Sequence, residues 1–221
     1  MSERKIVLPG EYLGEKKGRK IKNVYLEGEK VYSKYLGLLK DNENEISVIP
    51  LAGKYMPKVG DRIIAKIEEV EVSGWLVDIN SPYVAFLPLG LAMEEFVDIT
   101  RADLSRYYDV GDVIFCRVSK VTKNKIVQVS MKDPMARKLY KGMTIRITPS
   151  KVGRVIGKGG SMIQLIKKKT GCDVIVGQNG IVWIRGENKS KAVKAILTIE
   201  KEAHTVGLTE KIEKLLGEND G

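Results

Sequence analysis

Cysteine, histidine and aromatic residues are all scarce in this 221-residue sequence. The two cysteines, Cys116 and Cys172, lie far apart and form no CxxC pair, so we expect neither a structural disulfide nor a zinc site. The single histidine, His204, falls on a predicted helix and is interpreted as a surface residue. The acidic residues form no compact pattern that would hold a catalytic metal. We therefore expect no catalytic residue, no bound metal and no cofactor.

Long apolar runs are also missing from the chain. No segment approaches the roughly 20 apolar residues that a membrane-spanning helix needs. The first ten residues, MSERKIVLPG, lack the apolar core of a signal peptide. These two absences lead us to expect an intracellular, cytoplasmic protein with no membrane partner.

Positive charge is abundant and is concentrated toward the C-terminus. The net charge is +10 at pH 7. Residues 1–56 carry a net charge of +3 and residues 57–132 a net charge of −1. Residues 133–221 carry 17 basic and nine acidic side chains, a net charge of +8. This asymmetry favours a polyanionic partner, and a lysine-rich solvated surface is the alternative explanation.

The same three ranges are the domains that the residue pattern predicts, in a multidomain protein of mostly β plus α/β class. Residues 1–56 contain short β-like runs, including a hairpin across DNEN. Residues 57–132 contain five strand-like runs and a polar insert, a pattern typical of a five-stranded OB-type barrel. Residues 133–221 follow the order β-α-α-β-β-α, with Asn179 and Gly180 indicating a hairpin between the last two strands.

The segment VIGKGGSMI, residues 155–163, joins the two predicted helices of the third block. It is not a P-loop, because Gly159 follows Lys158 where a magnesium-binding hydroxyl is needed. It is not a dinucleotide fingerprint, because Met162 stands in the place of the last glycine. A GxxG turn in this element order resembles the KH domain, whose loop contacts a nucleic-acid backbone. Glycines would let that backbone approach closely, and the next helix would offer N–H groups to a phosphate.

Basic side chains surround this turn. Residues 151–171 contain six lysines and arginines and no acidic residue. An ordinary glycine turn with solvated lysines is the alternative, but the element order, the charge and the Asn-Gly hairpin together favour RNA contact. The predicted RNA-binding residues of this block are Arg154, Ile156, Gly157, Lys158, Gly159, Gly160, Lys167 and Lys168.

The middle block resembles the RNA-binding OB barrel of the ribosomal S-one type, through VGDRIIAKIEEVEVSGWLVDI, GDVIFCRVSKV and VQVSM. It departs from that family on the usual RNA face, where Ser73 and Leu76 replace aromatic residues and Pro88 replaces a common histidine. Strand alternation predicts that Trp75 belongs to the core. We therefore expect the barrel to meet RNA mainly through charge, with Arg117, Lys120, Lys123 and Lys125 as candidates.

The order of the three blocks resembles an archaeal exosome cap subunit of the KH-containing type, with IVLPGEYLG near the start and VDINSPYVAFLPL in the barrel. In that family, three cap subunits sit on a hexameric ring of RNase-PH-like proteins that degrades RNA from the 3′ end. A cap contains copies of this type or of a sister subunit with a zinc ribbon.

The resemblance implies a non-catalytic subunit that captures single-stranded RNA and feeds it into the ring, with the N-terminal domain docked on the ring. A stand-alone RNA-binding regulator of translation or transcription is the alternative. An RNA-processing enzyme would need a catalytic site, which the sequence does not display.

Overall fold

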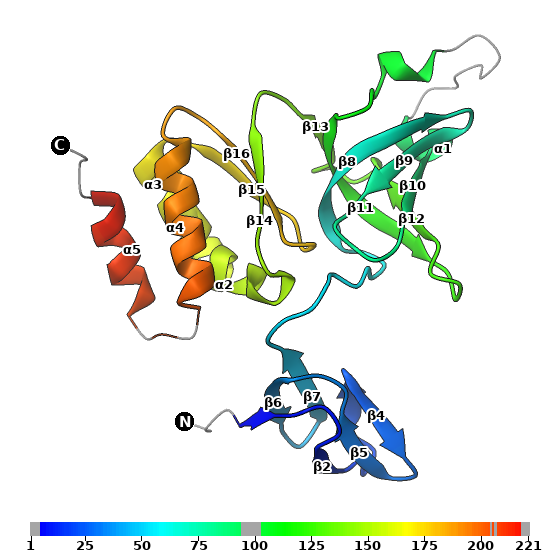
Figure 1. The fold of residues 1–221 in the computed structure, drawn as a ribbon, viewed down its shortest axis with the longest axis vertical. Coiled ribbons are helices and arrows are strands. Elements are labelled where there is room, and N and C mark those ends of the chain that lie inside the picture. The colour runs from blue at the N-terminus through cyan, green and yellow to red at the C-terminus, as the bar shows by residue number, and fades with distance from the viewer. Residues whose placement is uncertain (1–4, 94–102, 204, 206, 218–221) are drawn as a thin grey trace. The chain divides into compact units, whose positions relative to one another are not determined.

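The structure is a computed structural model that describes residues 5–93, 103–203, 205 and 207–217. It divides the chain into two compact units, Met1–Gly53 and Lys54–Gly221 (Figure 1). The finer division predicted at residues 56 and 132 stays a prediction. His204, which the sequence assigns to the surface of a helix, lies outside the described residues.

Two small sheets build the first unit. Strands β1 (Ile6–Val7), β6 (Gly37–Asp41), β7 (Glu45–Pro50) and β3 (Lys20–Lys22) form one sheet in this order. The other sheet has the order β2 (Tyr12–Glu15), β5 (Lys30–Ser33), β4 (Val24–Glu27). Strands β6 and β7 form the hairpin predicted across DNEN. The buried core of this unit consists of Val7, Leu13, Val31, Ile46 and Val48.

The second unit begins with a closed barrel. Its strands are β8 (Arg62–Glu71), β9 (Gly74–Asp78), β10 (Ala85–Pro88), β11 (Val113–Val121) and β12 (Val127–Ser130). The strand order is β12-β10-β9-β8-β11, and pairing of β12 with β11 closes the ring. The predicted five-stranded OB-type barrel is therefore confirmed.

The barrel interior contains Trp75, as strand alternation predicts. Its side chain has no exposed surface, and its indole N–H donates to the carbonyl oxygen of Tyr108 at 2.8 Å. The polar insert of the barrel is described from Asp103 onward and contains a single turn of 3₁₀ helix, Leu104–Arg106. Two short elements were not expected from the sequence: helix α1 (Leu89–Ala92), and strand β13 (Arg137–Leu139), which pairs with β11.

The remaining part of the second unit has the predicted KH fold. Its elements are β14 (Met143–Arg146), α2 (Val152–Ile156), α3 (Ser161–Thr170), β15 (Asp173–Val176), β16 (Ile181–Arg185) and α4 (Lys189–Lys201). The sheet order is β14-β16-β15, and the helices lie against one side of this sheet (Figure 1). A further helix, α5 (Leu208–Gly217), buries Leu208, Ile212 and Leu216 against the same core, because these residues recur at helical spacing on one face.

The β15–β16 hairpin joins the KH part to the barrel through Asn179. This side chain is fully buried, and its amide donates to the carbonyl oxygens of Ile64 at 2.7 Å and Ile79 at 2.9 Å. Its amide oxygen accepts the N–H of Ile64 at 3.3 Å. Because both polar atoms of the Asn179 side chain have partners, its burial adds directional bonds without an unsatisfied side-chain donor or acceptor.

Apolar contacts support the same junction. Ile181 and Trp183 of β16 pack in one buried cluster with Ile64, Phe115 and Leu139, which belong to the barrel sheet. The hydrophobic contacts favour association, and the Asn179 bonds fix its register. The barrel and the KH part are therefore held in one arrangement within the second unit.

Candidate nucleic-acid interface

The GxxG loop, Gly157–Gly160, forms a tight turn between α2 and α3. Gly157 has φ of 77°, and a Cβ at this position would lie 2.6 Å from the backbone nitrogen of Met162, so only glycine fits. Gly159 has φ of 60°, and no atom lies within 4 Å of the place a Cβ would take. Lys158 and Gly159 are both exposed. The loop thus presents bare backbone and one ammonium group to solvent.

Helix α3 begins directly after this loop. Gly160 is its N-cap residue, with φ of 84°, and no side chain caps the helix. The N–H of Ser161 donates to the carbonyl oxygen of Lys158, and the following N–H groups of the first turn have no side-chain cap. The positive end of the helix dipole lies beside Lys158. A phosphate placed on the loop would meet N–H groups and a positive charge together.

The other predicted KH residues lie on the two helices that flank the loop. Lys168 is exposed on α3, and Lys167 of the same helix is half-buried with its ammonium 3.5 Å from the carboxylate of Asp173. Arg154 of α2 is exposed and donates from Nε to the carbonyl oxygen of Ala203. Ile156 packs against the KH core at the end of α2. The structure thus brings these predicted residues to one region, and their contact with RNA stays a prediction.

Arg117, a predicted barrel contact, has a structural partner. Its guanidinium lies 3.8 Å from the carboxylate of Asp133, which Arg62 also contacts at 3.1 Å. The backbone N–H of Met135 and these two arginines hold the pKa of Asp133 below its ordinary value. This network joins the segment before β13 to the barrel. Arg117 therefore has a structural role that explains its position without RNA contact.

The three predicted barrel lysines are exposed around the turn from β11 to β12. Lys120 belongs to β11, and Lys123 and Lys125 belong to the turn. Figure 1 shows this turn on the side of the barrel away from the KH helices. The structure therefore separates these lysines from the GxxG loop, and the two predicted groups form distinct surfaces.

An aromatic groove beside Lys125 was missed by sequence reasoning. A cavity of about 350 Å³ is lined by Leu76, Tyr83, Phe86 and Lys125, among others, and the Lys125 ammonium lies 5.9 Å from the Tyr83 ring centroid. The signal was present in β10, where Phe86 stands between the buried Ala85 and Leu87 and so faces outward. Aromatic rings beside a cation are the surface on which nucleic-acid bases stack.

Comparison with protein families gives three consecutive matches along the chain. Residues 4–52 match the exosome RNA binding protein RRP4 N-terminal domain, residues 54–101 match the RRP4 S1 domain, and residues 142–201 match the KH domain. Three proteins named exosome complex component Rrp4 are similar over nearly the whole chain. The protein of Pyrococcus horikoshii is 41% identical over 98% of this chain and 83% of its own length. That of Methanothermus fervidus is 38% identical over 98% and 96%, and that of Picrophilus torridus is 41% identical over 100% and 97%.

This chain belongs to the Rrp4 family of exosome components. A solved crystal structure titled as an exosome complex RNA-binding protein agrees with this assignment, with a TM-score of 0.68, 33% identity, and coverage of 74% of this chain and 95% of that one. The predicted family resemblance is thereby confirmed.

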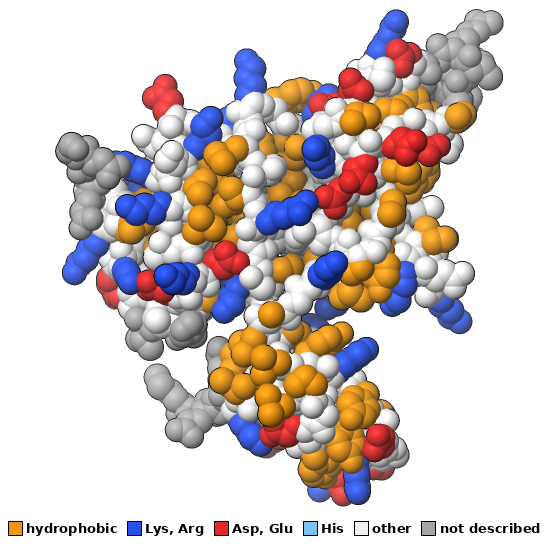
Figure 2. Space-filling model, in the orientation of Figure 1, with side chains coloured by type: hydrophobic (Ala, Val, Ile, Leu, Met, Phe, Trp, Pro, Cys, Tyr) orange, Lys and Arg blue, Asp and Glu red, His pale blue; other side chains and the backbone are white. Residues whose placement is uncertain are grey.

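The first unit, which matches the Rrp4 N-terminal domain, exposes many apolar side chains. Of the 18 exposed large hydrophobic residues in the described part of the chain, seven lie between Ile6 and Ile49. Figure 2 shows hydrophobic side chains gathered in patches on this unit. Exposed apolar patches of this kind mark interaction surfaces.

Two cross-strand rows account for much of this surface. Ile6, Leu38 and Ile49 pair directly across β1, β6 and β7, which we call the aliphatic row. Ile6 is 59% and Ile49 44% exposed. The second row consists of tyrosines on the other sheet, Tyr12, Tyr32 and Tyr25.

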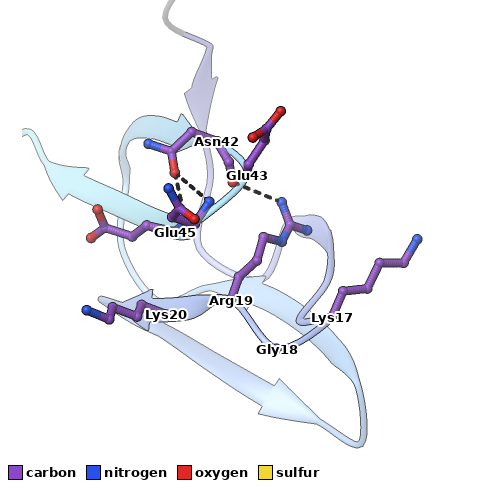
Figure 3. A pocket seen from close by; sticks show the side chains of 8 residues that line it. Lys17, Gly18, Arg19, Lys20, Asn42, Glu43 and Glu45 are labelled. Atoms are coloured by element: carbon purple, nitrogen blue, oxygen red, sulfur yellow. Dashed lines mark hydrogen bonds between the residues drawn. The ribbon is translucent and has the colours of Figure 1, made fainter.

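A polar cavity of about 570 Å³ also lies in the first unit, between the β2–β3 and β6–β7 turns (Figure 3). Arg19 crosses it and donates to the carboxylate of Asp41 at 2.6 Å and to the carbonyl oxygen of Glu15 at 2.6 Å. The Asn42 side chain accepts the N–H of Glu45 at 2.8 Å. The Arg19–Asp41 bond links the two segments and the other two bonds hold each turn in shape, so the polar residues of this cavity have structural roles.

No group of three or more His, Cys, Asp or Glu side chains in the described part of the chain could hold a metal ion. Among the same residues, no helix is both long and apolar enough to cross a membrane.

Proposed function

We propose that this chain is a non-catalytic cap subunit of an exosome, which captures single-stranded RNA and feeds it to a hexameric ring of RNase-PH-like subunits. The ring would degrade the RNA from its 3′ end by phosphorolysis. The observation that carries the proposal is the exposed GxxG loop, Gly157–Gly160, within a segment of six basic and no acidic side chains. Such a loop binds the phosphate backbone of RNA, and this contact does not depend on the base sequence.

Each of the three domains would have its own role in this function. Residues 1–56 would dock on the ring, and the exposed aliphatic row supports this role because an obligate partner must cover it. Residues 57–132 and 133–221 would bind RNA through the barrel and the KH domain. Three cap subunits, copies of this chain or of the zinc-ribbon type, would complete the complex in the cytoplasm.

Co-purification from native extract tests this assignment. We expect a tagged copy of the chain, expressed in its source organism, to co-purify with RNase-PH-like subunits in near-equal amounts. Treating the extract with ribonuclease first removes partners that are bridged only by RNA. Recovery of ribosomes or RNA polymerase instead of ring subunits would contradict the proposal and support a stand-alone regulator.

A further inference from the structure

The tyrosine row lies on the three-stranded sheet of β2, β5 and β4 in the first unit (Figure 1). Tyr12 and Tyr25 each pair with Tyr32 of the central strand, so the three side chains lie on one face of the sheet. The neighbours of Tyr32 in that strand, Val31 and Ser33, are both fully buried. Strand alternation therefore turns the tyrosines away from the core of the unit and leaves the row at its surface.

The rings of the row form a stack that is open at one end. The rings of Tyr25 and Tyr32 are nearly parallel, with an interplanar angle of 16° and centroids 5.3 Å apart. The ring of Tyr12 is tilted by 60° to that of Tyr32, at 5.7 Å. Among the strands that the structure describes, β4 is the last on its side of the sheet, and its Tyr25 is 40% exposed. A flat ring placed against Tyr25 would continue the stack.

A lysine adjoins the open end of the stack. The backbone N–H of Lys34 donates at 3.4 Å to the carbonyl oxygen of Asn23, two residues before Tyr25, and the Lys34 side chain is exposed. At the other end of the central strand, Lys30 lies opposite one glutamate on each neighbouring strand, and these carboxylates balance its charge. The cationic end of this face is therefore the end at Lys34.

The two rows of the first unit differ in chemistry. The aliphatic row is purely apolar and suits a permanent protein partner. The tyrosines combine rings, on which bases stack, with phenol groups that form hydrogen bonds to water. Residues 1–56 also carry a net charge of +3. Aromatic rings beside a lysine in a basic unit are the combination that binds single-stranded nucleic acid.

We propose that the tyrosine row is a further RNA-binding surface of this chain, separate from the barrel and the KH domain. One base stacks on Tyr25, and the adjoining phosphate contacts the ammonium of Lys34. The contact does not depend on base identity, because a tyrosine ring stacks on any base. This inference rests on the proposed RNA-binding function and extends it to the first unit, whose other sheet carries the aliphatic row.

Replacement of Tyr25 in the full-length chain tests the stacking contact. We expect Tyr25→Ala to lower the affinity for single-stranded RNA about fivefold or more. Tyr25→Phe keeps the ring and should bind as the unmodified chain does. For an oligonucleotide of equal length without bases, all three proteins should have the same affinity, since no base is there to stack. The thermal unfolding transition shows whether each variant is folded.

The salt dependence of binding tests the phosphate contact. We expect Lys34→Ala to make the slope of log affinity against log salt shallower by about 0.7, the value of one phosphate contact on a single strand. Tyr25→Ala should leave this slope unchanged, because stacking releases no counterion. Lys30→Ala is the matched control, since the charge of Lys30 is already balanced by glutamates, and it should change the slope little.

Photocrosslinking of the unmodified chain locates the contact. A single-stranded RNA carrying 5-iodouridine is irradiated with the protein, and the crosslinked peptides are identified by mass spectrometry. We expect an adduct at Tyr25. Tyr140 is the internal control, because it is 59% exposed and has the Lys138 ammonium 5.5 Å from its ring centroid, but does not belong to the row. An adduct at Tyr140 without one at Tyr25 would contradict the proposal.

The outcomes separate this inference from the proposed function. RNA binding that depends on the GxxG loop but keeps full affinity in a folded Tyr25→Ala variant would overturn the tyrosine surface alone. Loss of association with ring subunits by Tyr25→Ala, with unchanged RNA affinity, would assign the row to a protein partner and also overturn it. Absence of any RNA binding by the unmodified chain would overturn the proposed function and, with it, this inference.

Discussion

Replacing Lys158 and Gly159 with aspartate should reduce the affinity for single-stranded RNA by at least about tenfold. The two new carboxylates would repel phosphates at the place where the loop offers an ammonium group and bare backbone. The fold should survive, because both positions are exposed and a Cβ at residue 159 meets no atom within 4 Å. Aspartate is also among the residues that tolerate a positive φ.

Fluorescence anisotropy at several salt concentrations measures this effect. The slope of log affinity against log salt should become shallower as phosphate contacts are lost. The matched control is Lys194→Asp with Gly217→Asp, which makes the same charge change at exposed positions of α4 and α5. If the loop variant unfolds at the normal temperature and keeps its affinity, the loop is not a phosphate-binding site.

Replacing Ile49 with glutamate should abolish association with the ring and leave RNA affinity unchanged. Ile49 is 44% exposed at the end of the aliphatic row, so the change costs the isolated unit little. A protein partner covering the row would have to bury an unpaired carboxylate, which costs several kcal/mol or more. RNA binding should persist, because the GxxG loop belongs to the other unit.

Size-exclusion chromatography with purified ring subunits measures this association. Tyr25→Glu is the matched control, since Tyr25 is 40% exposed but lies in the tyrosine row of the other sheet. Removal of residues 1–53 should have the same effect as Ile49→Glu. If only Tyr25→Glu loses association with the ring, the docking surface is the tyrosine row. If the chain without residues 1–53 still associates normally, the docking surface lies in the second unit.

The features that local sequence encodes were predicted well. The hairpin of β6 and β7, the five barrel strands and the GxxG turn each depend on neighbouring residues, whose spacing and glycine content are visible in the chain. Trp75 was assigned to the core from strand alternation alone, and it is fully buried. The predicted RNA contacts of the KH part lie on α2, on α3 and on the loop that joins them, and their contact with RNA stays a prediction.

Contacts between distant segments were not predictable in this way. Asn179 was read only as a turn residue, because its partner Ile64 lies 115 residues earlier in the chain. The same is true of Arg117, whose contact with Asp133 depends on how the segment after the barrel returns to it. Phe86 was missed for a different reason: the family resemblance points to positions 73, 76 and 88, whereas Phe86 lies between them on the strand that pairs with β9.

Under the proposed function, this chain delivers RNA to a nuclease without being one. The most direct measurement follows the phosphate-dependent shortening of a labelled single-stranded RNA by ring subunits, by this chain alone, and by the two together. We expect no shortening by the chain alone and faster shortening by the mixture than by the ring. Shortening by the purified chain that a point substitution removes, or a mixture no faster than the ring, would contradict the proposed function.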